Sequence, residues 1–281
     1  MVLERDAVPL GRYRMPGAGR DGVLLRRGRA LARVIHIDGE PVVVHSWDAG
    51  SCVRIRAESA RRETALAGVE RMRFALGTDH DLGDFHRRFR RDRLIGGVIR
   101  RQPWLRPRRR PEPFEALAWA VCEQLIESGR AAGIQRRLVR RFGRPSGCGG
   151  LRDVPSAALL AGRSPAELEA CGLAAKRALA LIRAAREVAA GRVDLSEHEP
   201  AWRRLATTPN IGPWTLEKLA FEGQGRDDQL PAGDLAYVKL VGRLAGLGRR
   251  ASEDEVRAFF APYEEHAGLA GIYALRVTRA A

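Results

Sequence analysis

The first third of the chain contains short stretches in which apolar and polar residues alternate. Residues 22–38, 39–48 and 52–58 are rich in β-branched residues and are separated by Asp-Gly and Asp-Ala-Gly sequences. Alternation over such short lengths is typical of half-buried β-strands, and Asp-Gly between two of them indicates a hairpin turn. A helical pattern follows over Glu63–Leu76. We therefore predict an α+β N-terminal domain, an antiparallel sheet with helices, over residues 1–105.

The pattern changes in the Pro- and Arg-rich segment 101–114, where we expect the domain boundary. Beyond it, apolar residues recur at helical spacing, and Gly, Pro or Asn stands at most of the breaks. The expected helices are 114–128, 133–142, 156–161, 165–170, 174–190, 200–207, 213–222, 235–247, 253–263 and 266–277. The second domain, residues 106–281, is therefore expected to be mostly α-helical.

Composition narrows the class of protein. No apolar run approaches the ~20 residues that span a bilayer, and the N-terminus lacks the apolar core of a secretory signal. The four cysteines are far apart in the 281-residue chain and form no CxxC sequence. We therefore expect a cytoplasmic protein without disulfides, metal or cofactor.

The chain is strongly basic, with a formal net charge of +15 and 49 basic residues, of which three are lysine. Eleven arginines and one acidic residue lie between Arg87 and Arg110. Such a charge favours a polyanionic partner, most often nucleic acid. The arginine run has two interpretations, a solvated linker or a segment that faces phosphates with salt-sensitive affinity.

A short hairpin stands out in the helical half, in the sequence TTPNIGPWTLEKLAFE over Thr207–Glu222. Gly212 can adopt a positive φ and Asn210 tolerates one. Pro213 suits the first position of a helix. The backbone amides around Gly212, Trp214 and Thr215 are then expected to point outward and to form an anion site suited to a phosphate. The alternative is an ordinary connection between two helices.

An aspartate follows the second helix of the hairpin. The turn at residues 231–233 delivers Asp234 to the start of the next expected helix. Aspartate is favoured there as an N-cap, because its carboxylate accepts a hydrogen bond from a free amide. The helix dipole also favours a negative charge at this end. A cap role does not exclude a second, chemical role.

These segments together resemble a known family. LATTPNIGPWTLEKLAFEG followed by LPAGDLAYVKL is similar to the hairpin, Gly/Pro-rich loop and aspartate of the helix-hairpin-helix DNA glycosylase superfamily, and most of all to its 3-methyladenine DNA glycosylase II (alkylpurine) subgroup. PFEALAWAVCEQLI and LEACGLAAKRALALIRAARE resemble two further core helices. The resemblance covers nearly the whole chain and places the helix-hairpin-helix at about residues 200–222.

The resemblance implies excision of a damaged base by hydrolysis of its N-glycosidic bond. Asp234 matches the catalytic carboxylate, and a fixed anion suits a sugar that becomes cationic when the base leaves. Leu125 matches the residue that fills the space of a flipped nucleotide, although it could equally be a core leucine. By the same resemblance, Trp214, Trp119 and Tyr237 are expected in the base pocket, and Gln124, Leu125, Asn210, Ile211, Gly212, Thr215 and Lys239 against DNA.

Some positions depart from the family pattern. Relatives that also cut the strand carry a lysine where this chain has Trp214, so we expect no lyase step. A tryptophan face also suits a cationic alkylated base. Lys218 and Arg279 replace two aromatic residues of the pocket, and two cations would repel such a base unless they point away or pair with acids. A structural cation at the hairpin carbonyls is possible by likeness only.

Three functional hypotheses follow. The first is a monofunctional glycosylase, acting as a monomer on double-stranded DNA with alkylated purines. The second is a catalytically weak or inactive glycosylase-like protein that binds damaged DNA. The third, a helical protein unrelated to DNA, predicts no salt-dependent DNA affinity.

Overall fold

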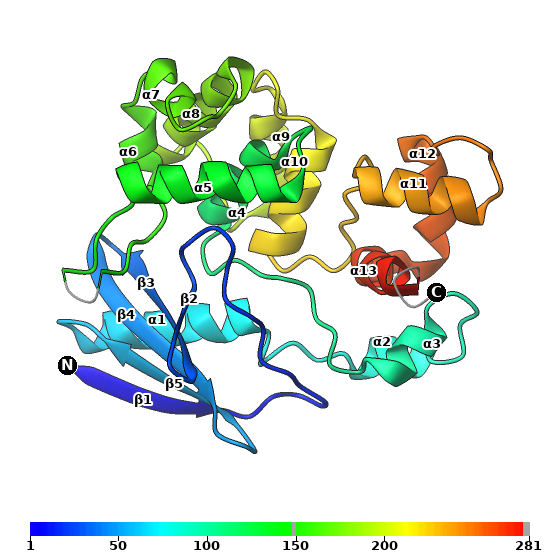
Figure 1. The fold of residues 1–281 in the computed structure, drawn as a ribbon, viewed down its shortest axis with the longest axis horizontal. Coiled ribbons are helices and arrows are strands. Elements are labelled where there is room, and N and C mark those ends of the chain that lie inside the picture. Colours follow the sequence, from blue (N-terminus) through cyan, green and yellow to red (C-terminus); the bar gives the residue numbers. More distant parts are fainter. Residues whose placement is uncertain (148–149, 278–281) are drawn as a thin grey trace.

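A computed structural model describes residues 1–147 and 150–277 of the chain. An N-terminal β-sheet with one long helix is followed by two groups of helices (Figure 1). The three largest hydrophobic clusters correspond to these parts, one between sheet and helix and one in each helical group. The predicted fold class, an α+β region followed by a mostly helical region, is confirmed.

The sheet has five antiparallel strands in the order β1-β5-β4-β3-β2. The strands are β1 Val2–Ala7, β2 Leu25–Arg27, β3 Ala30–Ile37, β4 Glu40–Asp48 and β5 Val53–Glu58. Asp38 and Gly39 take φ values of 51° and 81° in the tight turn between β3 and β4, as expected for an Asp-Gly hairpin. Helix α1, Arg62–Leu76, packs on the sheet through Val69 and Met72.

Strand β1 was not expected from the sequence. It pairs with β5 along its whole length, from Val2 opposite Glu58 to Ala7 opposite Val53. Only Leu3 and Ala7 of the strand are buried. Because it lies at the edge of the sheet and carries charged residues, its hydrophobic pattern is too weak to identify it.

The arginine run forms two short helices that were also unexpected, α2 Gly83–Phe89 and α3 Gly96–Arg101. Their apolar residues, including Phe85 and Ile99, join the core of the C-terminal group of helices. That group therefore combines chain segments separated by more than a hundred residues. Its other members are α11 Leu235–Leu244, α12 Glu253–Phe260, the 3₁₀-helix η2 Ala261–His266 and α13 Ala267–Val277.

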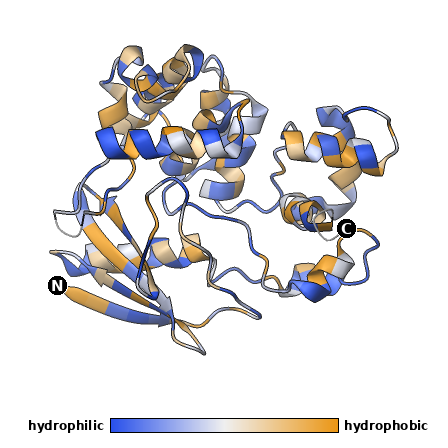
Figure 2. Cartoon of the chain, in the orientation of Figure 1, coloured by the Kyte–Doolittle hydropathy of each residue, from blue (hydrophilic) through white to orange (hydrophobic). Residues whose placement is uncertain are grey.

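The larger helical group packs around α4, Pro113–Glu123, whose residues from Glu115 to Cys122 are all buried. The other members are α5 Ser128–Phe142, α6 Ala157–Ala161, α7 Pro165–Glu169, α8 Ala175–Ala189, α9 His198–Ala206 and α10 Pro213–Lys218. In Figure 2 the visible face of α5 is largely hydrophilic, in keeping with an amphipathic helix at the surface. Within the described ranges, no helix has the length and apolar character to cross a bilayer.

Helix α10 continues as a π-helix, η1 Leu219–Gly223, instead of the uniform α-helix expected to Glu222. The close approach of η1 to α4 requires a glycine, because a Cβ on Gly223 would lie 2.7 Å from the Cβ of Ala116. Such π-turns are rare and occur often at functional sites. This one carries Glu222, a residue of the candidate site.

A buried ion-pair network joins the sheet to the larger helical group. Arg33 of β3 contacts Glu115 of α4 at 2.9 Å and Asp153 at 3.4 Å. Arg110 contacts Asp21 at 2.7 Å and Glu115 at 3.2 Å. The five side chains are each no more than 6% exposed. Removing one member would leave a buried charge unpaired, which is strongly destabilising.

Candidate active site

The helix-hairpin-helix is formed by α9, the turn at residues 207–212 and α10. Asn210 takes the left-handed conformation with φ +67°, whereas Gly212 is extended with φ −105° and ψ −178°. The positive φ that the sequence allows at either residue is therefore taken by Asn210 and not by Gly212. Ile211 is 4% exposed and anchors the turn in the core.

The amide of Thr215 is not free, contrary to expectation. It donates to the carbonyl of Gly212 at 3.0 Å. The Thr215 hydroxyl accepts a hydrogen bond from Nε2 of Gln124 at 2.9 Å, and the same Nε2 donates to the carbonyl of Asn210 at 2.8 Å. Gln124 thus braces the hairpin from the end of α4 and brings together three of the predicted DNA-contacting residues.

Leu125 is fully exposed, with a relative exposure of 103%. Helix α4 ends at Glu123, earlier than predicted, and Leu125 follows in the left-handed conformation with φ +54°. The guanidinium of Arg177 on α8 holds this turn by donating to the carbonyls of Cys122 and Gln124. An exposed leucine in an unfavourable backbone conformation is typical of a functional position, and the interpretation as a core leucine was wrong.

Asp234 is the N-cap of α11. Its Oδ1 accepts a hydrogen bond from the amide of Ala236 at 2.8 Å, so the predicted cap role is confirmed. The side chain is half-buried and not sealed in the core. The cap fixes the carboxylate at the positive end of the helix and leaves it open to an approaching ligand.

Tyr237 lies one turn after Asp234 and is 4% exposed. Burial raises the pKa of the Tyr237 phenol, and the negative charges of Asp234 and Glu222 raise it further, while Lys218 opposes them. Lys239, also on α11, is exposed and borders a shallow basic surface with Arg243, Arg249 and Arg250.

Lys218 is held between two acids. Its Nζ lies 3.1 Å from Glu123 of α4 and also pairs with Glu222 of η1. Burial alone would lower the pKa of Lys218, but the two carboxylates raise it instead. Burial likewise opposes ionisation of Glu222, yet Lys218 and Arg110 lower its pKa. Lys218 and Glu222 are therefore both charged, and the cation is paired with its acidic neighbours.

Neither acid of this cluster was identified from the sequence. The spacing of four residues between Lys218 and Glu222 on one helix is a signal that could have revealed that pair. Glu123 comes from a different helix, and its approach depends on the packing of α4 against α10 and η1. Arg279, the second expected cation of the pocket, lies outside the described residues.

Trp214 and Trp119 have different environments. Trp214 is half-buried at the start of α10, and the ammonium of Lys218 lies 5.9 Å from the centre of its ring. Trp119 is 1% exposed, and its Nε1 donates to Asp21 at 3.2 Å. The prediction that Trp119 lines a base pocket is therefore wrong, because its side chain is enclosed in the core.

The arginine run does not form one phosphate-facing strip. Arg109 and Arg110 are 6% and 5% exposed, and they pair with Asp227 and with Asp21 and Glu115 respectively. Arg108 keeps a half-exposed side chain. The phosphate-facing interpretation is thus wrong for two of the three arginines at the end of the run.

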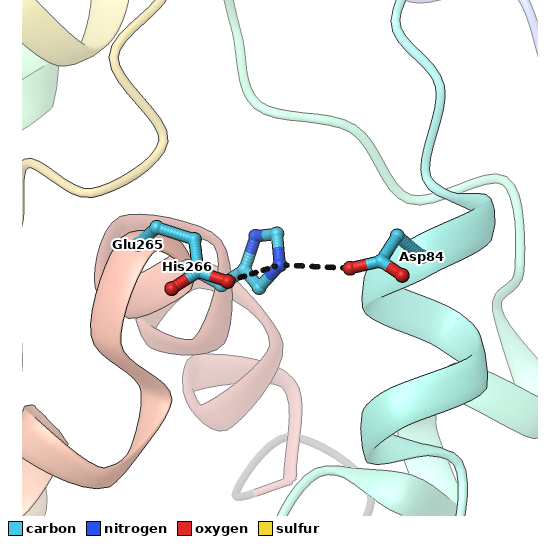
Figure 3. Close-up of side chains that lie close together, drawn as sticks. All are labelled: Asp84, Glu265 and His266. Carbon is cyan, nitrogen blue, oxygen red and sulfur yellow. Dashed lines mark ion pairs between the residues drawn. The ribbon is translucent and has the colours of Figure 1, made fainter.

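One further group of polar side chains lies where α2 meets η2 (Figure 3). Nε2 of His266 is 3.6 Å from a carboxylate oxygen of Asp84 and 3.6 Å from one of Glu265. These carboxylates also pair with Arg87 and Arg88. The arginines offset the negative charge that a metal ion requires, so the group is best described as an ion-pair cluster at the surface.

Residues 118–265 match the model of the HhH-GPD superfamily of base excision DNA repair proteins. The chain is 25% identical over 256 residues to a DNA-3-methyladenine glycosylase of Bacillus subtilis, covering 89% of this chain and 82% of that protein.

Solved structures share the fold. A 3-methyladenine DNA-glycosylase from Archaeoglobus fulgidus superimposes with a TM-score of 0.76 at 23% identity, over 90% of this chain and 87% of that one. An 8-oxoguanine glycosylase/lyase of Clostridium acetobutylicum, solved with double-stranded DNA, gives 0.72 at 15% identity, over 93% and 89%.

Proposed function

Because the chain belongs to the HhH-GPD superfamily of base excision DNA repair proteins, we propose that it is a monofunctional DNA glycosylase that flips out and excises alkylated purines of the 3-methyladenine and 7-methylguanine type. The observation that carries this proposal is the carboxylate of Asp234, fixed as an N-cap yet half-exposed. The similarity to a 3-methyladenine glycosylase over most of the chain supports the substrate class.

In the proposed mechanism, Asp234 faces the sugar of the flipped nucleotide. Loss of the base leaves a sugar with oxocarbenium character, and a preorganised carboxylate stabilises that developing charge. The same carboxylate can orient the attacking water or accept its proton. The alkylated purine leaves readily because its ring already carries a positive charge, so a strong general acid is not required.

Base recognition in this proposal relies on Trp214. Its indole face attracts a cationic ring with about 0.5–2 kcal/mol. Lys218 opposes this attraction little, since its ammonium is paired with Glu123 and Glu222. In this proposal Tyr237, buried one helical turn after Asp234, forms the floor of the base site.

DNA binding is assigned to residues around the hairpin and α4. In this proposal the backbone at Asn210, Gly212 and Trp214 meets phosphates. Lys239 meets the strand beside α11, and Leu125 fills the gap left by the flipped nucleotide. Gln124 acts mainly by holding the hairpin in place. The partner is double-stranded DNA with a damaged base, and we propose that the protein acts as a cytoplasmic monomer with domains divided near residue 105.

The proposal includes no lyase step, and the same residues support this. Schiff-base chemistry needs a neutral amine, whereas the amine of Lys218 is held as an ammonium between two acids. Trp214 cannot supply such a nucleophile. Strand cleavage at an abasic site should therefore stay at the level of a protein-free control.

A base-release assay tests the proposal. Duplex DNA methylated at purines is incubated with the protein and with Asp234→Asn, and free 3-methyladenine and 7-methylguanine are quantified. Release by the wild type alone supports it. Equal release by both proteins would reject the role of Asp234, and lesion-specific binding without any released base would favour the non-catalytic alternative.

A further inference from the structure

A cavity of about 410 Å³ lies far along the chain from Asp234, between the loop of residues 14–24, helix α1 and the segment 104–110. Its size falls in the range of small-molecule sites. Met15, Met72 and Leu76 give it apolar walls, and Trp104 stands at its border. None of these residues has a role in the proposed base excision.

The charged side chains around this cavity are unevenly balanced. Seven arginines line it, against two acids, Asp21 and Glu115. Three more acids pair with these arginines from outside the cavity: Asp153 with Arg33, Glu222 with Arg110 and Asp227 with Arg109. An excess of positive charge remains when all five acids are counted.

Several guanidinium groups around the cavity have hydrogen-bond donors without an acceptor. Nε of Arg33 and Nε of Arg106 are buried and have no hydrogen-bond partner among the described residues. The side chain of Arg33 is 4% exposed, so water does not replace that partner freely. Arg108 is 53% exposed, and its nearest acid, Asp21, is 3.7 Å away. An unpaired buried donor is costly, and a bound acceptor would relieve that cost.

The pKa values of the arginines around the cavity also favour binding of an anion. Burial lowers the pKa of Arg106 and Arg109, because the acids that face these groups do not fully offset the loss of hydration. Cations in that condition gain more from an added anion than cations at an open surface do. Arginine is also the side chain best suited to a phosphate or carboxylate.

We propose that this cavity binds a small organic anion with a flat apolar body, the chemistry of a nucleoside monophosphate. The anionic group pairs with the arginines of segment 104–110, and Arg108 at the opening is the first to meet it. The apolar body packs against Met72 and Leu76 of α1. The site is separate from the base pocket, although Arg110 of its wall contacts Glu222, which in turn pairs with Lys218.

Calorimetric titration of the full chain tests this site with three probes: AMP, adenosine and inorganic phosphate. We expect AMP to bind at least tenfold more tightly than adenosine or phosphate, since AMP alone combines the anionic group with the ring system. Arg108→Ala should weaken AMP at least tenfold, and Ala75→Phe, which narrows the cavity from α1, should abolish binding. Arg130→Ala, at an exposed arginine of α5, is the matched control and should bind AMP normally.

Other outcomes would overturn the proposal. Equal binding of AMP and phosphate would indicate a simple basic surface, and absence of heat at millimolar AMP would indicate no site. AMP binding that survives both Arg108→Ala and Ala75→Phe, or that is lost in Trp214→Ala, would place the ligand elsewhere. Because binding is measured without DNA, these results are independent of base release.

Discussion

The ammonium of Lys218 lies 5.9 Å from the centre of the Trp214 ring while it pairs with Glu123 and Glu222. A cation of the protein therefore stands beside the aromatic face proposed to receive a cationic base. The two carboxylates reduce the conflict, because both pair with the ammonium of Lys218. Substitution of Lys218 makes the surroundings of the Trp214 ring more negative, and substitution of Glu123 makes them more positive.

Two opposite substitutions should reveal that charge. Lys218→Gln makes the site more negative and should raise kcat/KM for 7-methylguanine release two- to tenfold, whereas Glu123→Gln should lower it by a similar factor. These factors correspond to about 0.4–1.4 kcal/mol, the range for partly exposed charges. Single-turnover and steady-state assays on methylated duplex DNA provide the measurement. Changes in the same direction for both variants would contradict the electrostatic interpretation.

Substitution of Asp234 by Asn should separate chemistry from stability. Asparagine caps helices about as well as aspartate, so the midpoint of thermal unfolding should change little. Base release should fall by roughly 10²–10³-fold, the usual cost of removing one preorganised electrostatic group. Circular dichroism melting and base release are measured on the same preparation. A large loss of stability in this variant would mean that lost activity cannot be assigned to the carboxylate.

Leu125→Ala should leave the fold intact, because the side chain contributes no buried surface in the free protein. We expect a change in unfolding free energy of less than about 0.5 kcal/mol. Base release from fully paired duplex should fall more than release from DNA in which the lesion faces a mismatch, since flipping a mismatched base costs less. Equal effects on the two substrates would argue against a wedge. Leu179→Ala, at another exposed leucine, on α8, serves as the control.

Arg110→Ala should be the most destabilising change among the arginines of segment 87–110. It removes the nearest cation from the buried Asp21 and one of the two arginines that pair with the buried Glu115. Breaking such a buried pair typically costs about 3–5 kcal/mol. Arg108→Ala, at a half-exposed side chain, should cost less than about 1 kcal/mol. Urea unfolding of the two variants gives the comparison. Similar stabilities would mean that the buried ion pairs contribute little.

Acid should weaken the protein through the same network. Burial opposes ionisation of Asp21 and Asp153, but the neighbouring arginines and His36 dominate and lower the pKa of each carboxyl. A folded-state pKa below the unfolded value gives stability that is present above about pH 4 and lost as the pH falls through the folded pKa. Urea unfolding between pH 6 and pH 3 should show this decline. The decline should be smaller in Asp153→Asn, which lacks one of the two titrating groups.

The sequence predicted those features of the site that depend on local geometry. Asp234 after a turn and Pro213 at the start of a helix are local signals, and both lie where they were expected. The features that were missed depend on contacts between distant segments. The helical spacing of Trp119 fits a core residue and a pocket residue equally well. Its hydrogen bond to Asp21, a residue distant in the sequence, shows that it belongs to the core.

The arginine run shows the same limit. Nothing in the local sequence distinguishes Arg108 from Arg109 and Arg110, yet the acids that surround the last two come from residues 21, 115 and 227. Strand β1 and helices α2 and α3 were missed because their few apolar residues have partners elsewhere in the chain. The turn at Leu125 could not be anticipated either, since Arg177 holds it from another helix.

The C-terminal group of helices draws α2 and α3 from one part of the chain and α11 to α13 from another. During synthesis, Phe85 and Phe89 emerge long before the residues that cover them. At translation rates of 5–20 residues per second, the interval is on the order of 10 s. During that time these aromatic residues are exposed and can associate with other proteins. A chaperone that binds exposed aromatic segments should therefore have its main site at residues 82–101.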